Sequence, residues 1–158
     1  TRASLIYDQI TAGEQPGEVT YSEAYAVVPF GNRLVTIDMT GDQIRQALEQ
    51  QYQPVPARGS RPMLALGVSN GFSYAWDSSQ PQNSRVVPGS MSLNGAPMDM
   101  GATYRVAVAN FLQEGGDLFT AFKLGTNLGG GLEDVPALVD YLGANPGLSA
   151  PASRIAGL

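Results

Sequence analysis

Apolar and polar side chains alternate along several stretches of the chain. An alternation of period two places the apolar residues on one face, which is typical of a β-strand with one buried face. The strands predicted in this way cover residues 33–39, 68–76 and 103–109. A further strand is expected to begin at Arg85, and the Asn94-Gly95 pair predicts a β-hairpin because both residues tolerate a positive φ.

Two other stretches space their apolar residues at i, i+3, i+4 and i+7, which predicts amphipathic helices over residues 41–51 and 135–142. The first of these helices follows a capping box formed by Thr40 and Gln43, and a similar box at Thr20 predicts a short helix before Pro29. Proline- and glycine-rich stretches predict irregular structure over residues 52–62, 110–118 and 125–131, and a tail from residue 147.

Helices and strands intermix without a regular βαβ period, so the predicted class is α+β, a mixed β-sheet packed with helices. The length of 158 residues fits one domain spanning residues 1–158. The first residue is Thr1 and not Met, so we expect the chain to be a processed or excised piece.

Composition narrows the chemistry that the chain can perform. The net charge is −5 and no run of Lys or Arg occurs, which argues against binding a nucleic-acid backbone. The sequence has no Cys, which excludes disulfides, and no His, which excludes the usual general base and the usual ligand of catalytic zinc. No stretch reaches the roughly 20 apolar residues that a membrane-spanning helix needs.

The segment Asn110–Asp117 is the strongest candidate for a ligand site. Its two glycines permit a close backbone approach, its Phe could stack on a flat ring, and its Asp could accept hydrogen bonds from a vicinal diol. The residues alone favour the simpler interpretation, a turn with a core Phe111 and a capping Asp117. Phe72, Tyr74 and Trp76 could form a stacking platform, but an ordinary sheet face packed on a helix is the preferred interpretation.

Five motifs in register resemble the C-terminal domain of the 5'-nucleotidase family and cover about residues 2–142. These motifs are Gly17-Glu18-Val19-Thr20-Tyr21, Val28-Pro29-Phe30-Gly31-Asn32 with Met39-Thr40-Gly41, the run from Gly67 to Asp77, Tyr104-Arg105-Val106-Ala107, and Asn110-Phe111 with Gly115-Gly116-Asp117. The resemblance implies a domain that binds the nucleoside part of a substrate. It implies that an N-terminal calcineurin-like domain, absent from this sequence, holds two divalent metal ions.

The resemblance also implies the roles of individual residues. Phe111 matches the aromatic that stacks on the base, Asp117 matches the carboxylate that holds the ribose hydroxyls, and Gly115 and Gly116 complete that loop. Arg2 matches the last residue of an Asn-x-Gly-x-Arg element that contacts substrate, so the domain would be truncated at its N-terminus. No catalytic or metal-binding residue is assigned to this chain.

Two departures from the family pattern leave alternatives open. The second stacking aromatic falls on Ala65 or Leu66, with Phe72 nearby, and the Gly after the signature Asp is Leu118. We therefore keep three hypotheses: the recognition half of a nucleotide hydrolase, a non-catalytic interaction module, and a hydrolase of a non-nucleotide phosphoester. The expected ligand is a nucleoside or nucleotide, the expected partner is the chain's own metallophosphatase domain, and the expected location is periplasmic, secreted or at a bacterial cell surface.

Overall fold

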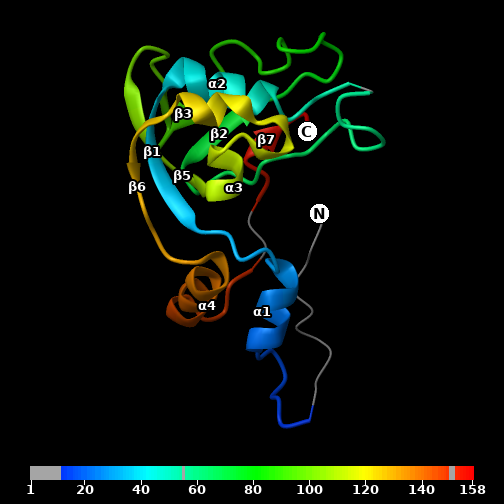
Figure 1. Ribbon diagram of the computed structural model, residues 1–158, viewed down its shortest axis with the longest axis vertical. Coiled ribbons are helices and arrows are strands. Elements are labelled where there is room, and N and C mark those ends of the chain that lie inside the picture. The colour runs from blue at the N-terminus through cyan, green and yellow to red at the C-terminus, as the bar shows by residue number, and fades with distance from the viewer. Residues whose placement is uncertain (1–11, 55, 150–151) are drawn as a thin grey trace.

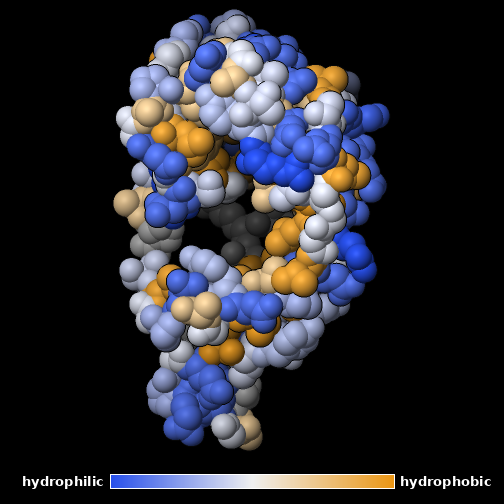
Figure 2. Space-filling model, turned by 90° about the vertical axis from the view of Figure 1, so that its left-hand side faces the viewer, coloured by the Kyte–Doolittle hydropathy of each residue, from blue (hydrophilic) through white to orange (hydrophobic). Residues whose placement is uncertain are grey.

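A computed structural model describes residues 12–54, 56–149 and 152–158. The molecule has a larger part that holds two sheets and the helix α2 (Gly41–Glu49), and a smaller part that holds α1 (Tyr21–Val27) and α4 (Asp134–Ala144) (Figure 1). Helices α1 and α4 pack against each other, and strands of the first sheet lead from this pair into the larger part. Seen from the side, the surface is hollowed between the two parts, with hydrophobic residues around the hollow (Figure 2).

The first sheet is built around β1 (Leu34–Thr40). It pairs in antiparallel register with β5 (Thr103–Ala109) on one side and with β6 (Thr126–Gly129) on the other. The alternation read from the sequence is confirmed, because every second side chain of β1 is buried. These side chains are the centre of the first hydrophobic core, whose fully or nearly buried members are Val35, Ile37, Met39, Ala47, Val108, Phe119, Ala121 and Phe122.

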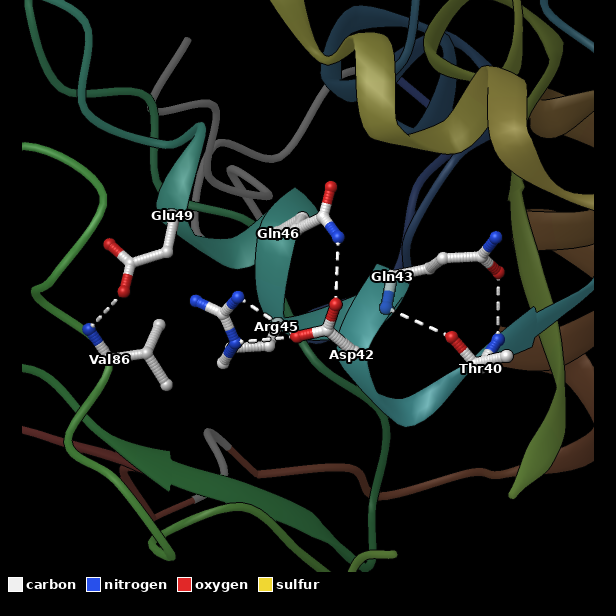
Figure 3. Close-up of polar contacts among 7 residues, drawn as sticks. All are labelled: Thr40, Asp42, Gln43, Arg45, Gln46, Glu49 and Val86. Carbon is white, nitrogen blue, oxygen red and sulfur yellow. Dashed lines mark hydrogen bonds and ion pairs between the residues drawn. The ribbon is translucent and has the colours of Figure 1, made fainter. Parts of the chain in front are cut away.

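Helix α2 follows β1 directly and begins at the predicted capping box. The Thr40 hydroxyl accepts from the Gln43 backbone N–H at 3.2 Å, and the Gln43 side chain accepts from the Thr40 backbone N–H at 2.8 Å (Figure 3). A residue larger than glycine does not fit at Gly41, since a Cβ there would collide with the Asp99 carbonyl oxygen. The helix contributes one buried residue to each core, Ala47 to the first and Leu48 to the second.

The second sheet has the strand order β4-β3-β2-β7, with bounds Ala96–Pro97, Ser92–Leu93, Phe72–Ala75 and Ile155–Ala156. The predicted hairpin is confirmed, with Asn94 at φ 53° and Gly95 at φ 80° joining β3 to β4. Tyr74 and Trp76 are buried and pack with Leu48 of α2, while Phe72 packs at the margin of the same core. The aromatic alternation is therefore an ordinary packed sheet face, as the preferred interpretation held.

The α+β class is confirmed, but several local expectations were wrong. The stretches expected to be irregular contain α3 (Asn110–Gln113), the 3₁₀ turn η1 (Gly116–Leu118), and the strands β6 and β7. A second 3₁₀ turn, η2 (Thr120–Leu124), lies between two of these stretches. Strands β6 and β7 are formed by pairing with β1 and β2, and a local sequence pattern does not contain that information. The strand expected at Arg85 is reduced to one bridge between Val86 and Trp76, and the strand predicted over 68–76 spans only β2.

Candidate functional site

The candidate loop begins where β5 ends, and its first residue is fixed by the neighbouring loop. The Asn110 backbone N–H donates to the Arg33 carbonyl at 2.8 Å, and the Asn110 side-chain oxygen accepts from the Arg33 backbone N–H at 2.8 Å. This pair of hydrogen bonds between distant parts of the chain continues the β1–β5 pairing by one residue. It therefore places the loop before β1 beside the start of α3.

Phe111 follows this anchor and is 46% exposed, so it is not the core residue that the simpler interpretation supposed. Its ring lies against Gly116, since a Cβ added at Gly116 would stand 2.5 Å from Phe111 Cζ and 2.6 Å from Cε1. The ring is thus supported by backbone from one direction while nearly half of the residue faces solvent. An aromatic held in this way can offer a flat apolar surface to a ligand.

The residues beside Gly116 adopt the left-handed conformation. Gly115 has φ 88°, Asp117 has φ 51° and Leu118 has φ 65°. This region is comfortable for glycine and costs other L-residues roughly 1–2 kcal/mol each. The Asp117 carboxylate is exposed and accepts no hydrogen bond from the part of the chain that the structure describes. It is therefore available to accept hydrogen bonds from a ligand.

A second exposed aromatic, Phe30, was not predicted from the sequence as a site residue. It is 62% exposed on the loop that ends at Arg33, the residue bonded to Asn110. Two hydrogen bonds between Asn32 and Asp134 hold the same loop. The Asn32 N–H donates to the Asp134 carboxylate at 3.1 Å, and the Asp134 N–H donates to the Asn32 carbonyl at 2.9 Å. The rings of Phe30 and Phe111 make no ring contact with each other. The available signal was an apolar residue inside a Pro-Phe-Gly turn, where burial is not expected.

Of the positions expected to carry the second aromatic, two lie in a cleft with Asp117 and one does not. Ala65 and Leu66 line a cleft of about 810 Å³ together with Asp117 and Phe119. Phe72 lines a different, mainly apolar cleft of about 600 Å³ and packs on Tyr74 with 6.0 Å between ring centroids. The structure thus brings Asp117 together with Ala65 and Leu66 but not with Phe72. Arg2 lies outside the described residues.

Arg58 reaches this loop from the irregular segment after α2. One terminal nitrogen donates to the Asp117 carbonyl oxygen, and the guanidinium carbon lies 5.0 Å from the centroid of the Phe119 ring. Burial lowers the pKa of Arg58, while the nearby Asp117 charge acts in the opposite direction. The candidate site thus combines an exposed aromatic, a carboxylate that accepts no hydrogen bond from the described residues, and an arginine committed to the loop backbone.

Neither a metal site nor a membrane helix is found in the described ranges. No group of three or more metal-ligating side chains occurs there, so the described residues offer no site for a divalent ion, and the resemblance assigns the expected pair of ions to a separate domain. No helix in those ranges is long and apolar enough to cross a membrane.

Comparison with known proteins agrees with the motif series. The family model for the C-terminal domain of 5'-nucleotidase matches residues 3–124. The chain is 37% identical over 127 residues to the trifunctional nucleotide phosphoesterase protein YfkN of Bacillus subtilis (strain 168), covering 76% of this chain and 8% of that protein. It is 36% identical over 107 residues to the cell wall protein Lmo0130 of Listeria monocytogenes serovar 1/2a, covering 67% of this chain and 13% of that protein.

A solved structure gives the same result. The 5'-nucleotidase precursor from Thermus thermophilus superposes with a TM-score of 0.69 and 33% sequence identity, over 89% of this chain and 28% of that chain. The chain thus spans less than a third of the length of each of these relatives. Since the family model covers most of the sequence, the chain belongs to the family of 5'-nucleotidase C-terminal domains.

Proposed function

We propose that this chain recognises the nucleoside part of a nucleotide for a larger metal-dependent phosphohydrolase. One observation supports the proposal above all others. The exposed Phe111 ring rests on Gly116, and the next residue, Asp117, presents a carboxylate that the described residues leave unbonded. A flat apolar surface beside a hydrogen-bond acceptor suits a base joined to a sugar diol.

In this proposal Phe111 stacks on one face of the base and Phe30 lies on the other. Both rings are exposed, and their loops are joined at Arg33 and Asn110. Stacking on an aromatic stabilises binding by roughly 1–3 kcal/mol per base. Asp117 then accepts from the ribose hydroxyls, and Arg2 contacts the substrate as the family resemblance implies.

The contribution of this chain to hydrolysis would be orientation. Holding the base and the ribose fixes where the phosphate lies, and such positioning lowers the barrier of a reaction that takes place elsewhere. The displacement chemistry belongs, in this proposal, to two divalent metal ions on a separate N-terminal metallophosphatase domain. The chain by itself is then inactive, and an extracytoplasmic location is consistent with a relative named as a cell wall protein.

Calorimetric titration of the chain tests the proposal. Adenosine, AMP, UMP and UDP-glucose are each titrated into the chain and into Phe111→Ala, Asp117→Ala and the control Leu128→Ala, an exposed residue of β6. We expect saturable nucleoside binding that Phe111→Ala and Asp117→Ala each weaken and Leu128→Ala preserves. Binding of ribose 5-phosphate as tight as that of AMP would favour a non-nucleotide phosphoester. Absence of binding by every ligand would overturn the proposal in favour of the interaction module.

A further inference from the structure

Arg58 connects two elements that lie far apart in the sequence. It belongs to the irregular segment after α2, yet its guanidinium turns back to the end of that helix. One terminal nitrogen donates to the Gln51 carbonyl at 2.7 Å and the other to the Gln50 carbonyl at 3.1 Å. Carbonyls at the end of a helix lack intrahelical partners, and a cation there is favourable both as a donor and towards the helix dipole.

The same side chain also holds the candidate loop. One terminal nitrogen of Arg58 donates both to the Gln50 carbonyl and to the Asp117 carbonyl. The guanidinium also lies over the ring of Phe119, which is 2% exposed. The Nε atom is buried and has no partner among the described residues. The terminal nitrogens of Arg58 are thus directed at main-chain carbonyls, so the residue is suited to fix the backbone and not to bind a phosphate.

The backbone that Arg58 holds needs a tertiary support. Asp117 and Leu118 both have left-handed φ angles, and neither belongs to a strand or to an α-helix. Strained conformations of this kind persist when surrounding contacts determine them. A second support comes from the Gln50 side chain, which donates to the Thr120 hydroxyl at 2.9 Å and accepts from the Ala121 N–H at 2.9 Å. Arg58 and Gln50 therefore hold the loop on the two sides of Phe119.

We propose that Arg58 is a positioning residue that sets the backbone of Asp117, and through it the direction of the carboxylate that receives the ribose hydroxyls. The inference rests on the proposed function, because Asp117 needs a defined direction only if it binds a ligand. Arg58 itself does not touch the substrate. A guanidinium is required because its planar fork serves the Gln50, Gln51 and Asp117 carbonyls together, whereas an ammonium is a point charge.

The test is a double-mutant cycle on ligand affinity. Adenosine and 2',3'-dideoxyadenosine are titrated into the wild-type chain, Arg58→Ala, Asp117→Ala and the double variant, with Arg61→Ala as a control. Arg61 is an exposed arginine of the same segment whose side chain has no hydrogen-bond or ion-pair partner among the described residues. Residues that act as one unit give non-additive effects in such a cycle.

We expect Arg58→Ala to weaken adenosine binding about tenfold, to leave dideoxyadenosine binding nearly unchanged, and to have no further effect in the Asp117→Ala background. Arg61→Ala should change neither affinity. Additive effects, or equal losses for both ligands, would overturn the inference while leaving the proposed function intact. If the wild-type chain binds no nucleoside, the proposed function fails first and the inference falls with it.

Circular dichroism and thermal melting establish that each variant is folded before titration. If Arg58→Ala is unfolded, Arg58→Lys takes its place, since it retains the charge and loses the fork. Arg58→Lys should then show the same selective loss for adenosine. A folded Arg58→Lys chain with wild-type affinity for both ligands would contradict the inference.

Discussion

The ring of Phe111 lies directly over Gly116, so close that a methyl group added at Gly116 would stand 2.5 Å from Phe111 Cζ. This contact joins the stacking candidate to the backbone beside Asp117. The position of the exposed ring is therefore set by a residue that has no side chain, and any substitution there must move the ring.

We predict that Gly116→Ala displaces the Phe111 ring. The binding free energy of a nucleoside should then weaken by at least the contribution of one stacking contact, about 1–3 kcal/mol. The ring is half-exposed and can swing outward, so the free energy of unfolding should change by less than about 1 kcal/mol. Gly130→Ala is the matched control because a Cβ there meets nothing within 4 Å. Titration and thermal melting of both variants are the measurements, and unchanged affinity in Gly116→Ala would contradict the prediction.

Leu118 is expected to carry backbone strain that glycine would relieve. Its φ of 65° is costly for a branched L-residue, and the residue is 41% exposed. Relief of this strain should offset much of the apolar burial lost on truncation, so Leu118→Gly should change the free energy of unfolding little in urea denaturation. Leu124→Gly makes the same change at an exposed leucine with an ordinary φ and should lower stability. A loss of stability in Leu118→Gly as large as that in Leu124→Gly would contradict the account.

Glu49 is expected to be essential for holding the end of α2 against the segment that contains Arg85 and Val86. It is 3% exposed, and one of its carboxylate oxygens accepts from the Arg85 N–H at 2.9 Å. The other accepts from the Val86 N–H at 2.8 Å (Figure 3). Glu49→Ala leaves two main-chain donors without acceptors and should lower the free energy of unfolding by about 3 kcal/mol. Asp140→Ala, on the exposed side of α4, should change it by less than about 0.5 kcal/mol. Urea denaturation of both variants distinguishes the two outcomes.

Stability should fall in acid partly because of Asp38. Its carboxylate accepts from Arg105 at 2.9 Å and from Asn127 at 2.8 Å, and these hydrogen bonds lower the pKa of Asp38 below its ordinary value. The charged form therefore stabilises the fold fully above the ordinary Asp pKa of about 4, and this contribution disappears as the pH falls through the lower folded-state value. Asp38→Asn should thus be less stable than wild type near neutral pH.

The measurement is the thermal midpoint of both proteins from about pH 6 to about pH 2.5. The difference between wild type and Asp38→Asn should narrow as the pH falls, because protonation removes the same interaction from the wild type. Asp140→Asn serves as the control and should follow the wild-type curve. Parallel curves for wild type and Asp38→Asn across this range would contradict the assigned role.

The sequence predicted what is encoded locally. The capping boxes at Thr20 and Thr40 each lie within four consecutive residues, and both form. The alternation of β1 and the Asn94-Gly95 turn are equally local, and both are present. Strand β6 was not predicted because its residues, Thr126–Gly129, form a strand through pairing with Thr36 and Asp38.

The residues of the candidate site likewise fall into two groups, those predicted by a local motif and those that only the fold brings together. Phe111, Gly116 and Asp117 stand close together in one motif and could be proposed from the sequence. Phe30 could not be selected, because its loop is joined to the candidate loop by the bonds between Arg33 and Asn110, which are 77 positions apart. Arg58 was also missed, since its partners are main-chain carbonyls, and these leave no trace in a pattern of side chains.

Fluorine NMR of the chain labelled with 4-fluorophenylalanine tests the central claim most directly, because the sequence contains five phenylalanines. Each resonance is assigned by replacing one phenylalanine with leucine, and adenosine is then titrated into the labelled chain. The account predicts that the signals of Phe30 and Phe111 shift with a common saturation curve, while those of the core residues Phe119 and Phe122 and of Phe72 do not. Saturable binding that shifts the signal of Phe72 and leaves that of Phe111 unchanged would contradict it.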